Sequence, residues 1–122
     1  MQTATDLTIT LQANRPGALV TALEALGRTG INVEGVTEFD GVLHLLTRDA
    51  ASATRALRSA GVRVRDERVV AVIGVEDRPG VAATMLRRVA DAGINVDFCY
   101  LATNTRLVIG ADDPEEIAKI LA

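Results

Sequence analysis

Two short turns in this 122-residue chain carry groups suited to binding a small carboxylate. The first turn is Asn14-Arg15-Pro16-Gly17 and the second is Asp77-Arg78-Pro79-Gly80. An apolar stretch with helical spacing follows each of them, so each turn leads into a helix N-terminus. Unpaired N–H groups and the positive end of the helix dipole attract anions there. In the first turn, the donors are expected to be the N–H groups of Gly17, Ala18 and Leu19.

Four polar side chains near these turns could complete such a site. Asn14 or Asp77 can accept a hydrogen bond from an α-amino group, whereas Asn32 and Asn95 each offer a donor and an acceptor. The charged Asp77 would repel a carboxylate, which favours the turn that contains the neutral Asn14. A structural alternative remains, because Pro-Gly turns also punctuate strands and helices, and the asparagines can serve only as hydrogen-bonding residues of helix ends and edge strands.

The residues available for catalysis or metal binding are few. The chain contains one histidine, His44, and one cysteine, Cys99, so it has no internal disulfide and no set of soft ligands for zinc or an iron–sulfur cluster. We expect His44 on a sheet face and Cys99 in a packing role, with no nucleophile–base pair. The acidic run 112–116 is expected to begin a helix. The sequence therefore predicts no enzyme activity, no metal and no cofactor.

Composition excludes several further classes of protein. A net charge of −3 and only 2% aromatic residues argue against nucleic-acid binding. No apolar stretch approaches the roughly 20 residues needed to span a bilayer, so no membrane role is expected. The N-terminus lacks a secretory signal, which predicts a cytoplasmic location. With 48% hydrophobic residues, the chain is expected to fold as a globule.

The elements that must position the two turns come from a repeat. Residues 15–33 recur as residues 78–96 at an offset of 63, with nine of nineteen positions identical. The same offset pairs Asp49 with Asp112. Nearly the whole chain is therefore two copies of one unit, residues 1–66 and 67–122. The join at residues 65–68 is predicted to be a short charged turn between two strands.

Each copy is expected to contain the same elements. In the first copy, strand 7–11 precedes a helix that has Pro16 in its first turn and ends at Gly30. An Asp40-Gly41 hairpin then joins strands 32–39 and 42–47. Asp49 caps a helix over 50–60, which strand 62–65 follows. The second copy repeats this pattern with strand 69–75, helix 79–92, strands 96–102 and 106–111, and a helix beginning at Asp113-Pro114.

These elements predict an α+β fold. It comprises two ferredoxin-like βαββαβ units packed side by side, with helices on one face of a shared antiparallel sheet. The second unit lacks its last strand within the given sequence. That loss exposes a sheet edge, which favours pairing with another chain and predicts a homodimer or higher oligomer.

The repeated Asx-Arg-Pro-Gly and Gly-Ile-Asn-Val motifs, at matched spacing in a βαββαβ pattern, resemble the ACT domain, a small regulatory module of amino-acid metabolism. The resemblance covers both halves, and a tandem pair is most similar to small amino-acid-binding ACT proteins. It implies two domains packed through their second strands, with small effectors bound where the domains meet.

The same resemblance implies which residues form two ligand sites. In each site, the turn of one half would act with the asparagine of the other half, and Gln12 lies where some amino-acid-binding members place a polar side chain. The implied sets are Asn14, Gly17, Ala18 and Leu19 with Asn95, and Asp77, Gly80, Val81 and Ala82 with Asn32.

Three functional hypotheses follow. The first is a non-enzymatic regulatory protein that binds a small effector, most simply an amino acid. The second is a ligand-free oligomerisation or interaction module that acts as a regulatory subunit of a metabolic enzyme or regulator. The third is an acylphosphatase-type enzyme on the same fold, which is disfavoured because Arg15 and Arg78 precede Pro-Gly and not a glycine-rich phosphate cradle.

Overall fold

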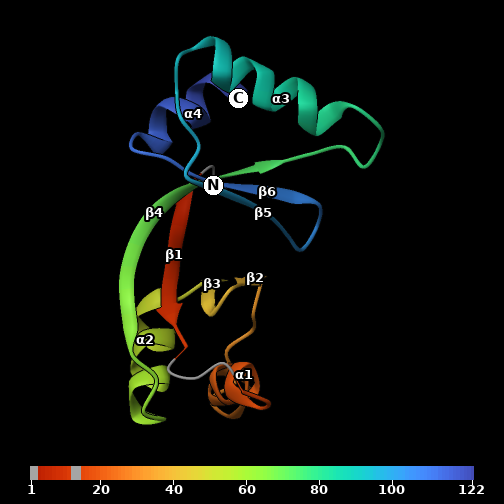
Figure 1. Ribbon diagram of the computed structural model, residues 1–122. Coiled ribbons are helices and arrows are strands. Elements are labelled where there is room, and N and C mark those ends of the chain that lie inside the picture. The colour runs from red at the N-terminus through yellow and green to blue at the C-terminus, as the bar shows by residue number, and fades with distance from the viewer. Residues whose placement is uncertain (1–2, 12–14) are drawn as a thin grey trace. The chain divides into compact units, whose positions relative to one another are not determined.

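The computed structural model describes residues 3–11 and 15–122. The chain divides into two compact units (Figure 1). The first unit is Thr5–Arg68, and the second is Val69–Ala122 together with Thr3 and Ala4 from the start of the chain. No helix in the described part of the chain has the length and apolar character needed to cross a membrane.

The first unit has two helices on one face of an antiparallel sheet. In this sheet β3 (Val42–Leu46) lies between β1 (Thr3–Thr10) and β2 (Gly35–Phe39), because it pairs with both. His44 on β3 lies opposite Thr8 on one side and Thr37 on the other. The elements are β1 (Thr3–Thr10), α1 (Ala18–Arg28), β2 (Gly35–Phe39), β3 (Val42–Leu46), α2 (Ala50–Ser59) and the first part of β4 (Val64–Gly74).

The second unit repeats this arrangement. The later part of β4 serves as its first strand, and β6 pairs antiparallel with both β4 and β5. Its remaining elements are α3 (Val81–Asp91), β5 (Phe98–Ala102), β6 (Arg106–Gly110) and α4 (Pro114–Leu121). The repeated α+β pattern predicted from the sequence is therefore confirmed.

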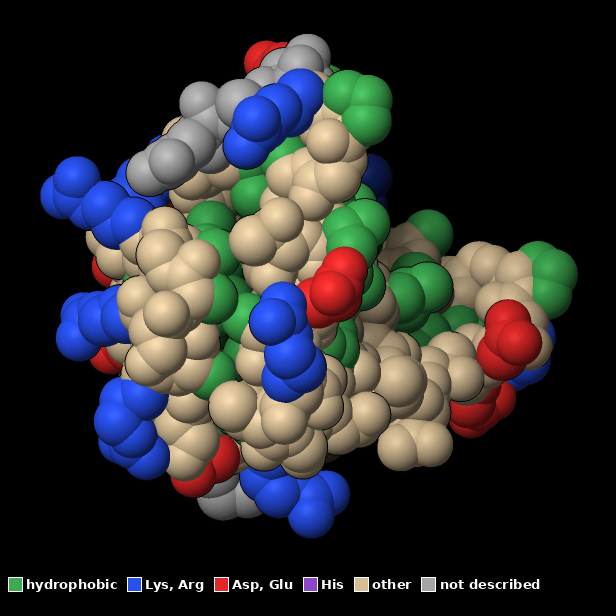
Figure 2. All heavy atoms as spheres, turned by 90° about the horizontal axis from the view of Figure 1, so that it is seen from below, with side chains coloured by type: hydrophobic (Ala, Val, Ile, Leu, Met, Phe, Trp, Pro, Cys, Tyr) green, Lys and Arg blue, Asp and Glu red, His purple; other side chains and the backbone are tan. Residues whose placement is uncertain are grey.

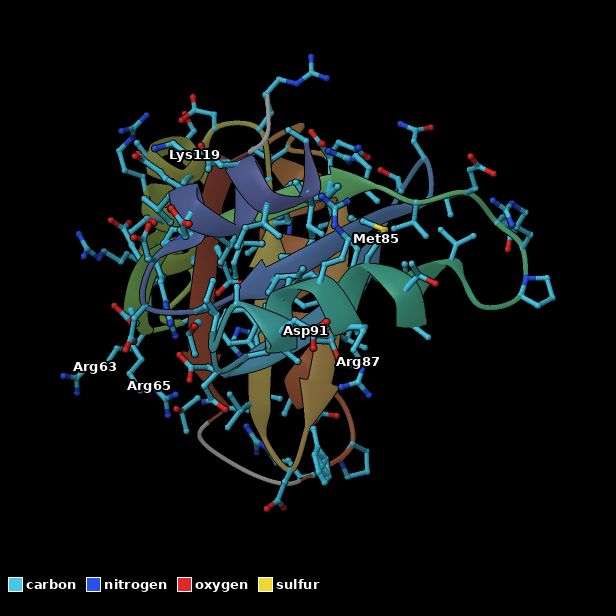
Figure 3. All side chains as sticks on the ribbon, turned by 90° about the horizontal axis from the view of Figure 1, so that it is seen from above. Arg63, Arg65, Met85, Arg87, Asp91 and Lys119 are labelled. Atoms are coloured by element: carbon cyan, nitrogen blue, oxygen red, sulfur yellow. The ribbon has the colours of Figure 1, made fainter. Side chains whose placement is uncertain are left out.

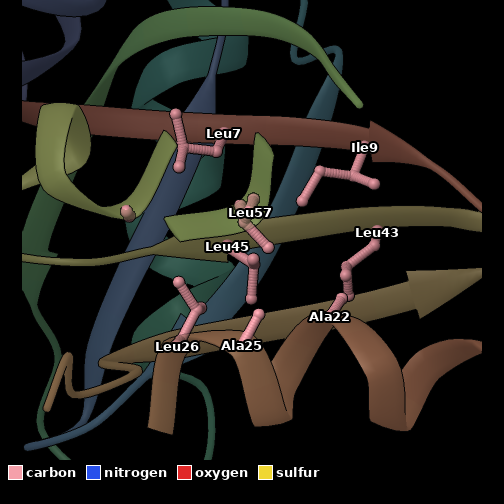
Figure 4. Close-up of a cluster of buried hydrophobic side chains, with 9 residues drawn as sticks. Leu7, Ile9, Ala22, Ala25, Leu26, Leu43, Leu45 and Leu57 are labelled. Atoms are coloured by element: carbon pink, nitrogen blue, oxygen red, sulfur yellow. The ribbon is translucent and has the colours of Figure 1, made fainter. Parts of the chain in front are cut away.

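The core of the first unit lies between its sheet and its helices. Alternate residues of β1 and β3 point to this side, as expected for strands with one buried face, and small alanines on α1 let the helix approach the sheet closely (Figure 4). The apolar stretch predicted to form a helix after the first turn packs on this core, with Leu26 buried and with Leu19 and Leu23 partly buried. The buried residues are Leu7, Ile9, Ala22, Ala25, Leu26, Leu43, Leu45, Ala53 and Leu57.

Glycines with positive φ follow three of the four helices, and Gly30 ends the first helix as predicted. After α1, Gly30 has φ +73° and its N–H donates to the Gly27 carbonyl at 3.1 Å, while the Ile31 N–H donates to the Leu26 carbonyl at 2.9 Å. This pair of bonds is the Schellman motif, which requires a left-handed residue that glycine adopts without steric cost. Gly61 and Gly93 make the same pair of bonds after α2 and α3.

The predicted helix starts at the Pro-Gly turns need correction. The sequence predicts Pro16 and Pro79 in the first helical turn, but α1 begins at Ala18 and α3 at Val81. The reason is that Gly17 and Gly80 have φ values of +90° and +86°, which lie outside the right-handed helical region. Each glycine is therefore the N-cap, and each proline belongs to the turn before it.

The predicted charged turn at residues 65–68 is wrong, because β4 continues through it as one strand of eleven residues. No glycine or proline interrupts this segment, so nothing in it requires a turn. The Thr54 hydroxyl on α2 also donates to a Glu67 carboxylate oxygen at 2.7 Å, which holds the strand against the helix in the first unit. The predicted boundary between residues 66 and 67 falls inside this strand.

The two copies differ in length at one hairpin. Asp40 and Gly41 both have positive φ, so the predicted two-residue turn is confirmed. In the second unit, Ala102 pairs with Arg106, which leaves a three-residue turn. The offset is therefore 64 and not 63 beyond this point. The counterpart of the helix cap Asp49 is Asp113 and not Asp112, because both side chains accept from the N–H three residues later.

Candidate functional site

A small hollow lies at the N-terminus of α1 in the first unit. Its volume is about 200 Å³, below the roughly 300–1,000 Å³ typical of pockets for drug-sized ligands. Its walls come from the end of β1, the start of α1 and the chain that leads from α2 to β4. The lining residues are Thr10, Leu11, Arg15, Ala18, Thr21, Ala60, Gly61, Val62 and Arg63.

The helix end beside this hollow has no side-chain cap. The Ala18 N–H donates to the Arg15 carbonyl at 3.3 Å, so this predicted free donor is already engaged, because the turn folds back on itself. No described residue accepts from the N–H of Gly17 or Leu19. The Thr21 hydroxyl donates to the Gly17 carbonyl at 3.1 Å. This end of α1 therefore retains N–H groups that suit a carboxylate.

The charged residues of the hollow are Arg15 and Arg63, and both are exposed. At its edge, Arg65 Nη1 donates to Thr10 Oγ1 at 3.0 Å. Sequence reasoning missed Thr10, Thr21 and Arg63 as site residues. Arg63 is 48 positions from Arg15, and only the return of the chain after Gly61 brings it to this helix end.

Only some of the ligand-binding residues predicted for the first turn line the hollow. Gln12 and Asn14 lie outside the described residues, so their roles stay predictions. Gly17 provides the left-handed N-cap, and Ala18 lines the hollow. The Leu19 side chain packs against the hydrophobic core, which leaves only its backbone for a ligand.

Asn32 lies at the other end of α1. It lines a separate cavity of about 790 Å³ with residues 29–31, beyond the helix C-terminus. A helix of eleven residues is ~16 Å long, so Asn32 does not meet the turn of its own unit. It also precedes β2, which begins at Gly35 and not at Asn32 as predicted. Asn95 likewise precedes β5, which begins at Phe98 and not at residue 96 as predicted.

The second turn has a similar backbone but different charges. Gly80 is the left-handed N-cap, and the Val81 N–H reaches the Arg78 carbonyl only at 3.5 Å. Arg78 Nε lies 2.6 Å from Glu76 Oε2, so a carboxylate neutralises the arginine of this turn.

The other residues predicted for the second ligand site have different surroundings. Asp77 is exposed beside the turn, and Ala82 is half-buried at the start of α3. The Asn95 amide donates to an Asp97 carboxylate oxygen at 3.4 Å, a local bond that engages its donor. The two turns are therefore alike in backbone and unlike in electrostatics.

A polar cluster on the sheet contains the single histidine. Asp6 Oδ1 lies 3.0 Å from His44 Nδ1, and Thr8 Oγ1 lies 3.3 Å from the same nitrogen. Asp6 is fully buried, and this face of β1 and β3 is opposite the helices. A hydrolytic triad needs the acid and the hydroxyl on different imidazole nitrogens, so this cluster does not have that geometry. Alternation with Leu7 and Ile9 was the sequence signal that Asp6 and Thr8 share a face.

The described residues do not favour metal binding or a reactive thiol. No three histidine, cysteine, aspartate or glutamate side chains in residues 3–11 and 15–122 gather as a metal site. Partial burial raises the pKa of the Cys99 thiol, which lowers its thiolate fraction at neutral pH.

Comparison with solved structures finds the same fold elsewhere. A protein from Bacteroides thetaiotaomicron is 21% identical, with a TM-score of 0.74 over 98% of this chain and 85% of that chain. The ligand-free regulatory subunit of aspartate kinase from Thermus thermophilus is 20% identical, with a TM-score of 0.71 over 98% and 86%. Aspartate kinase from Clostridium acetobutylicum matches over 99% of this chain but only 32% of its own, at 12% identity and a TM-score of 0.67.

The family of the chain is assigned from its sequence. No curated protein sequence matches the chain. The family model described as the ACT domain pair matches residues 2–122, which is almost the whole sequence. The match agrees with the repeated Pro-Gly turns, the repeated α+β pattern and the likeness to aspartate kinase regulatory subunits, and it supports a regulatory role. The chain belongs to the ACT domain pair family.

Proposed function

We propose that this protein is a non-enzymatic regulator that binds an amino acid at the N-terminus of α1 in its first unit. The observation that carries the proposal is the hollow of about 200 Å³ at that helix end. The helix offers N–H donors and a positive dipole, and Arg15 and Arg63 add positive charge. All of these groups favour a carboxylate, the group that every amino acid carries.

The first turn is the better candidate of the two for electrostatic reasons. Arg78 of the second turn is already paired with Glu76, and Asp77 adds a further negative charge there. Arg15 has no such carboxylate partner among the described residues. An incoming carboxylate therefore meets positive charge at the first turn and a neutralised arginine at the second.

Calorimetric titration of the full chain with each standard amino acid tests this function. Heat of binding for at least one amino acid is expected, and Arg15→Gln should weaken that binding severalfold. Arg28→Gln is the matched control, because Arg28 is an exposed arginine at the other end of α1. Absence of binding by every amino acid, or equal effects of the two variants, would contradict the proposal.

A second proposal concerns partners and has its own observation. Phe39 on β2 is an aromatic side chain with an exposed fraction of 76%, and aromatic residues are enriched in protein–protein interfaces. Together with the likeness to regulatory subunits, this favours a homodimer or a contact with a metabolic enzyme. Sedimentation of the wild-type chain and of Phe39→Ser tests self-association, which the variant should weaken. A monomer at all concentrations would contradict the homodimer.

A further inference from the structure

Three arginines of the first unit have no ion-pair partner in the part of the chain that the structure describes. Among the residues that the structure describes, Arg15, Arg58 and Arg63 make no hydrogen bond or ion pair. Other arginines of the unit do have such partners: Arg28 with Glu24, Arg48 with Glu34 and Arg55 with Ser52.

These three arginines border two adjoining hollows. The hollow at the α1 N-terminus contains Arg15, and a second hollow of about 470 Å³ contains Arg58. Both hollows are lined by Gly61, Val62 and Arg63, so Arg63 stands where they meet. Figure 3 shows Arg63 and Arg65 extending outward near the start of β4. Positive side chains also gather along one side of the face seen in Figure 2.

Neither hollow has a carboxylate among its described lining residues. This is notable in a chain with a net charge of −3. A neutral amino acid brings one carboxylate, which the helix N-terminus and Arg15 already suit. Arg58 lines only the second hollow and would then remain unpaired, while Arg63 lines both hollows and could contact a group in either. Guanidinium groups bind carboxylates through two parallel hydrogen bonds, so the second hollow suits a second anionic group.

We infer that the effector is an acidic amino acid, whose side-chain carboxylate is held by Arg58 and Arg63 in the second hollow. This inference rests on the proposed function and names the ligand class for that site. The α-carboxylate lies toward Arg15 and the N-terminus of α1, and the side chain extends past Arg63. Because all three arginines are exposed, their attraction is screened by salt, and affinity falls as ionic strength rises.

The duplication supports this choice of ligand. Arg15 corresponds to Arg78, whose charge Glu76 neutralises, and the structural offset of 64 places Ala122 at the position of Arg58. The second unit therefore lacks the unpaired arginines at these positions. The uncompensated charge belongs to the first unit and not to the shared fold.

Calorimetry with two isosteric pairs tests the inference on the full chain: L-aspartate against L-asparagine, and L-glutamate against L-glutamine. We expect at least one acid to bind about tenfold or more tightly than its amide at low salt, with a smaller ratio at high salt. Arg58→Gln and Arg63→Gln should each reduce this ratio severalfold, and Arg63→Lys should retain part of it.

Arg87→Gln is the matched control, since Arg87 is an exposed arginine of the second unit and its loss changes the net charge equally. Circular dichroism confirms that each variant is folded. If an amide binds as tightly as its acid, or if Arg58→Gln and Arg63→Gln behave like Arg87→Gln, the inference is overturned while the proposed function stands.

Succinate tests the anion site by itself, because it has two carboxylates and no ammonium group. Binding of succinate that depends on Arg58 and Arg63, without binding of any amino acid, would show a dicarboxylate site and contradict both the proposed function and the acidic amino acid as its ligand. Absence of binding by every probe would overturn both.

Discussion

Arg78 and Glu76 form a close ion pair, with Nε and Oε2 separated by 2.6 Å, and no described residue provides such a partner for the equivalent Arg15. The residue that corresponds to Glu76 in the first copy is Ala13. The replacement of Glu76 by Ala13 therefore accounts for why Arg78 is neutralised and Arg15 is not. This difference, on two similar turns, is the basis for assigning the ligand to the first unit.

Transferring the glutamate into the first copy should weaken ligand binding. Ala13→Glu reproduces the Glu-Asx-Arg spacing of the second turn, so the new carboxylate should compete for Arg15. We expect a severalfold loss of affinity for an acidic amino acid, measured by calorimetry at low salt. Ala13→Gln is the control, because it adds a side chain of similar size without charge. Equal losses in both variants would refute the electrostatic explanation.

Alanine at Gly17 should destabilise the protein. Gly17 has φ +90°, where a Cβ clashes with its own backbone, so Gly17→Ala should cost about 1 kcal/mol of unfolding free energy. Gly27→Ala is the control within the same helix. No atom lies within 4 Å of its added Cβ, so alanine there should stabilise by about 0.5–1 kcal/mol. Urea denaturation measures both, and changes of the same sign would contradict the prediction.

The cap of α2 should make stability depend on acid pH. Hydrogen bonds from the Ser52 N–H and hydroxyl lower the pKa of the Asp49 carboxyl below its ordinary value. A carboxylate with a lowered folded-state pKa stabilises the fold at pH values above its unfolded pKa. That contribution is lost as pH falls through the folded pKa.

Asp49→Asn provides the test, because asparagine still caps a helix but does not titrate. Urea midpoints measured at neutral pH and near pH 3 should differ less in this variant than in the wild type. The wild type should lose the cap's contribution in the acid range, in addition to losses shared by both proteins. Identical acid sensitivity of the two proteins would count against the role of Asp49.

The Phe98 ring covers Gly110 on the neighbouring strand. The two residues are directly opposite in the β5–β6 pairing, and a Cβ built on Gly110 would overlap the ring. Gly110→Ala should therefore cost roughly 1–3 kcal/mol, as for other overpacked sites. Gly74→Ala is the control, because its added Cβ meets no atom within 4 Å.

A double variant separates this clash from general strand damage. Phe98→Leu combined with Gly110→Ala should lose less stability than the sum of the two single variants, because a smaller side chain relieves the overlap. Thermal or urea unfolding of the four proteins measures this coupling. Strict additivity would show that the ring does not limit the size of residue 110.

The sequence predicts the local features of the fold because each of them depends on a few neighbouring residues. The Asp40-Gly41 hairpin, the glycine-terminated helices and the Asp49 cap all follow from backbone preferences within one turn of chain. The Pro-Gly turn was located correctly, but the helix start was placed two residues early. A left-handed Gly17 delays the first helical bond.

The sequence alone established the duplicated ACT pattern, the Pro-Gly turns and the scarcity of catalytic side chains. The tertiary structure decided that β4 runs without interruption, that the second hairpin shifts the repeat, and that Asp6 and His44 meet. It also brought Arg15 and Arg63 to one hollow across 48 positions. Helix ends and turns are determined by adjacent residues, whereas strand pairing and the convergence of charges depend on how distant segments pack.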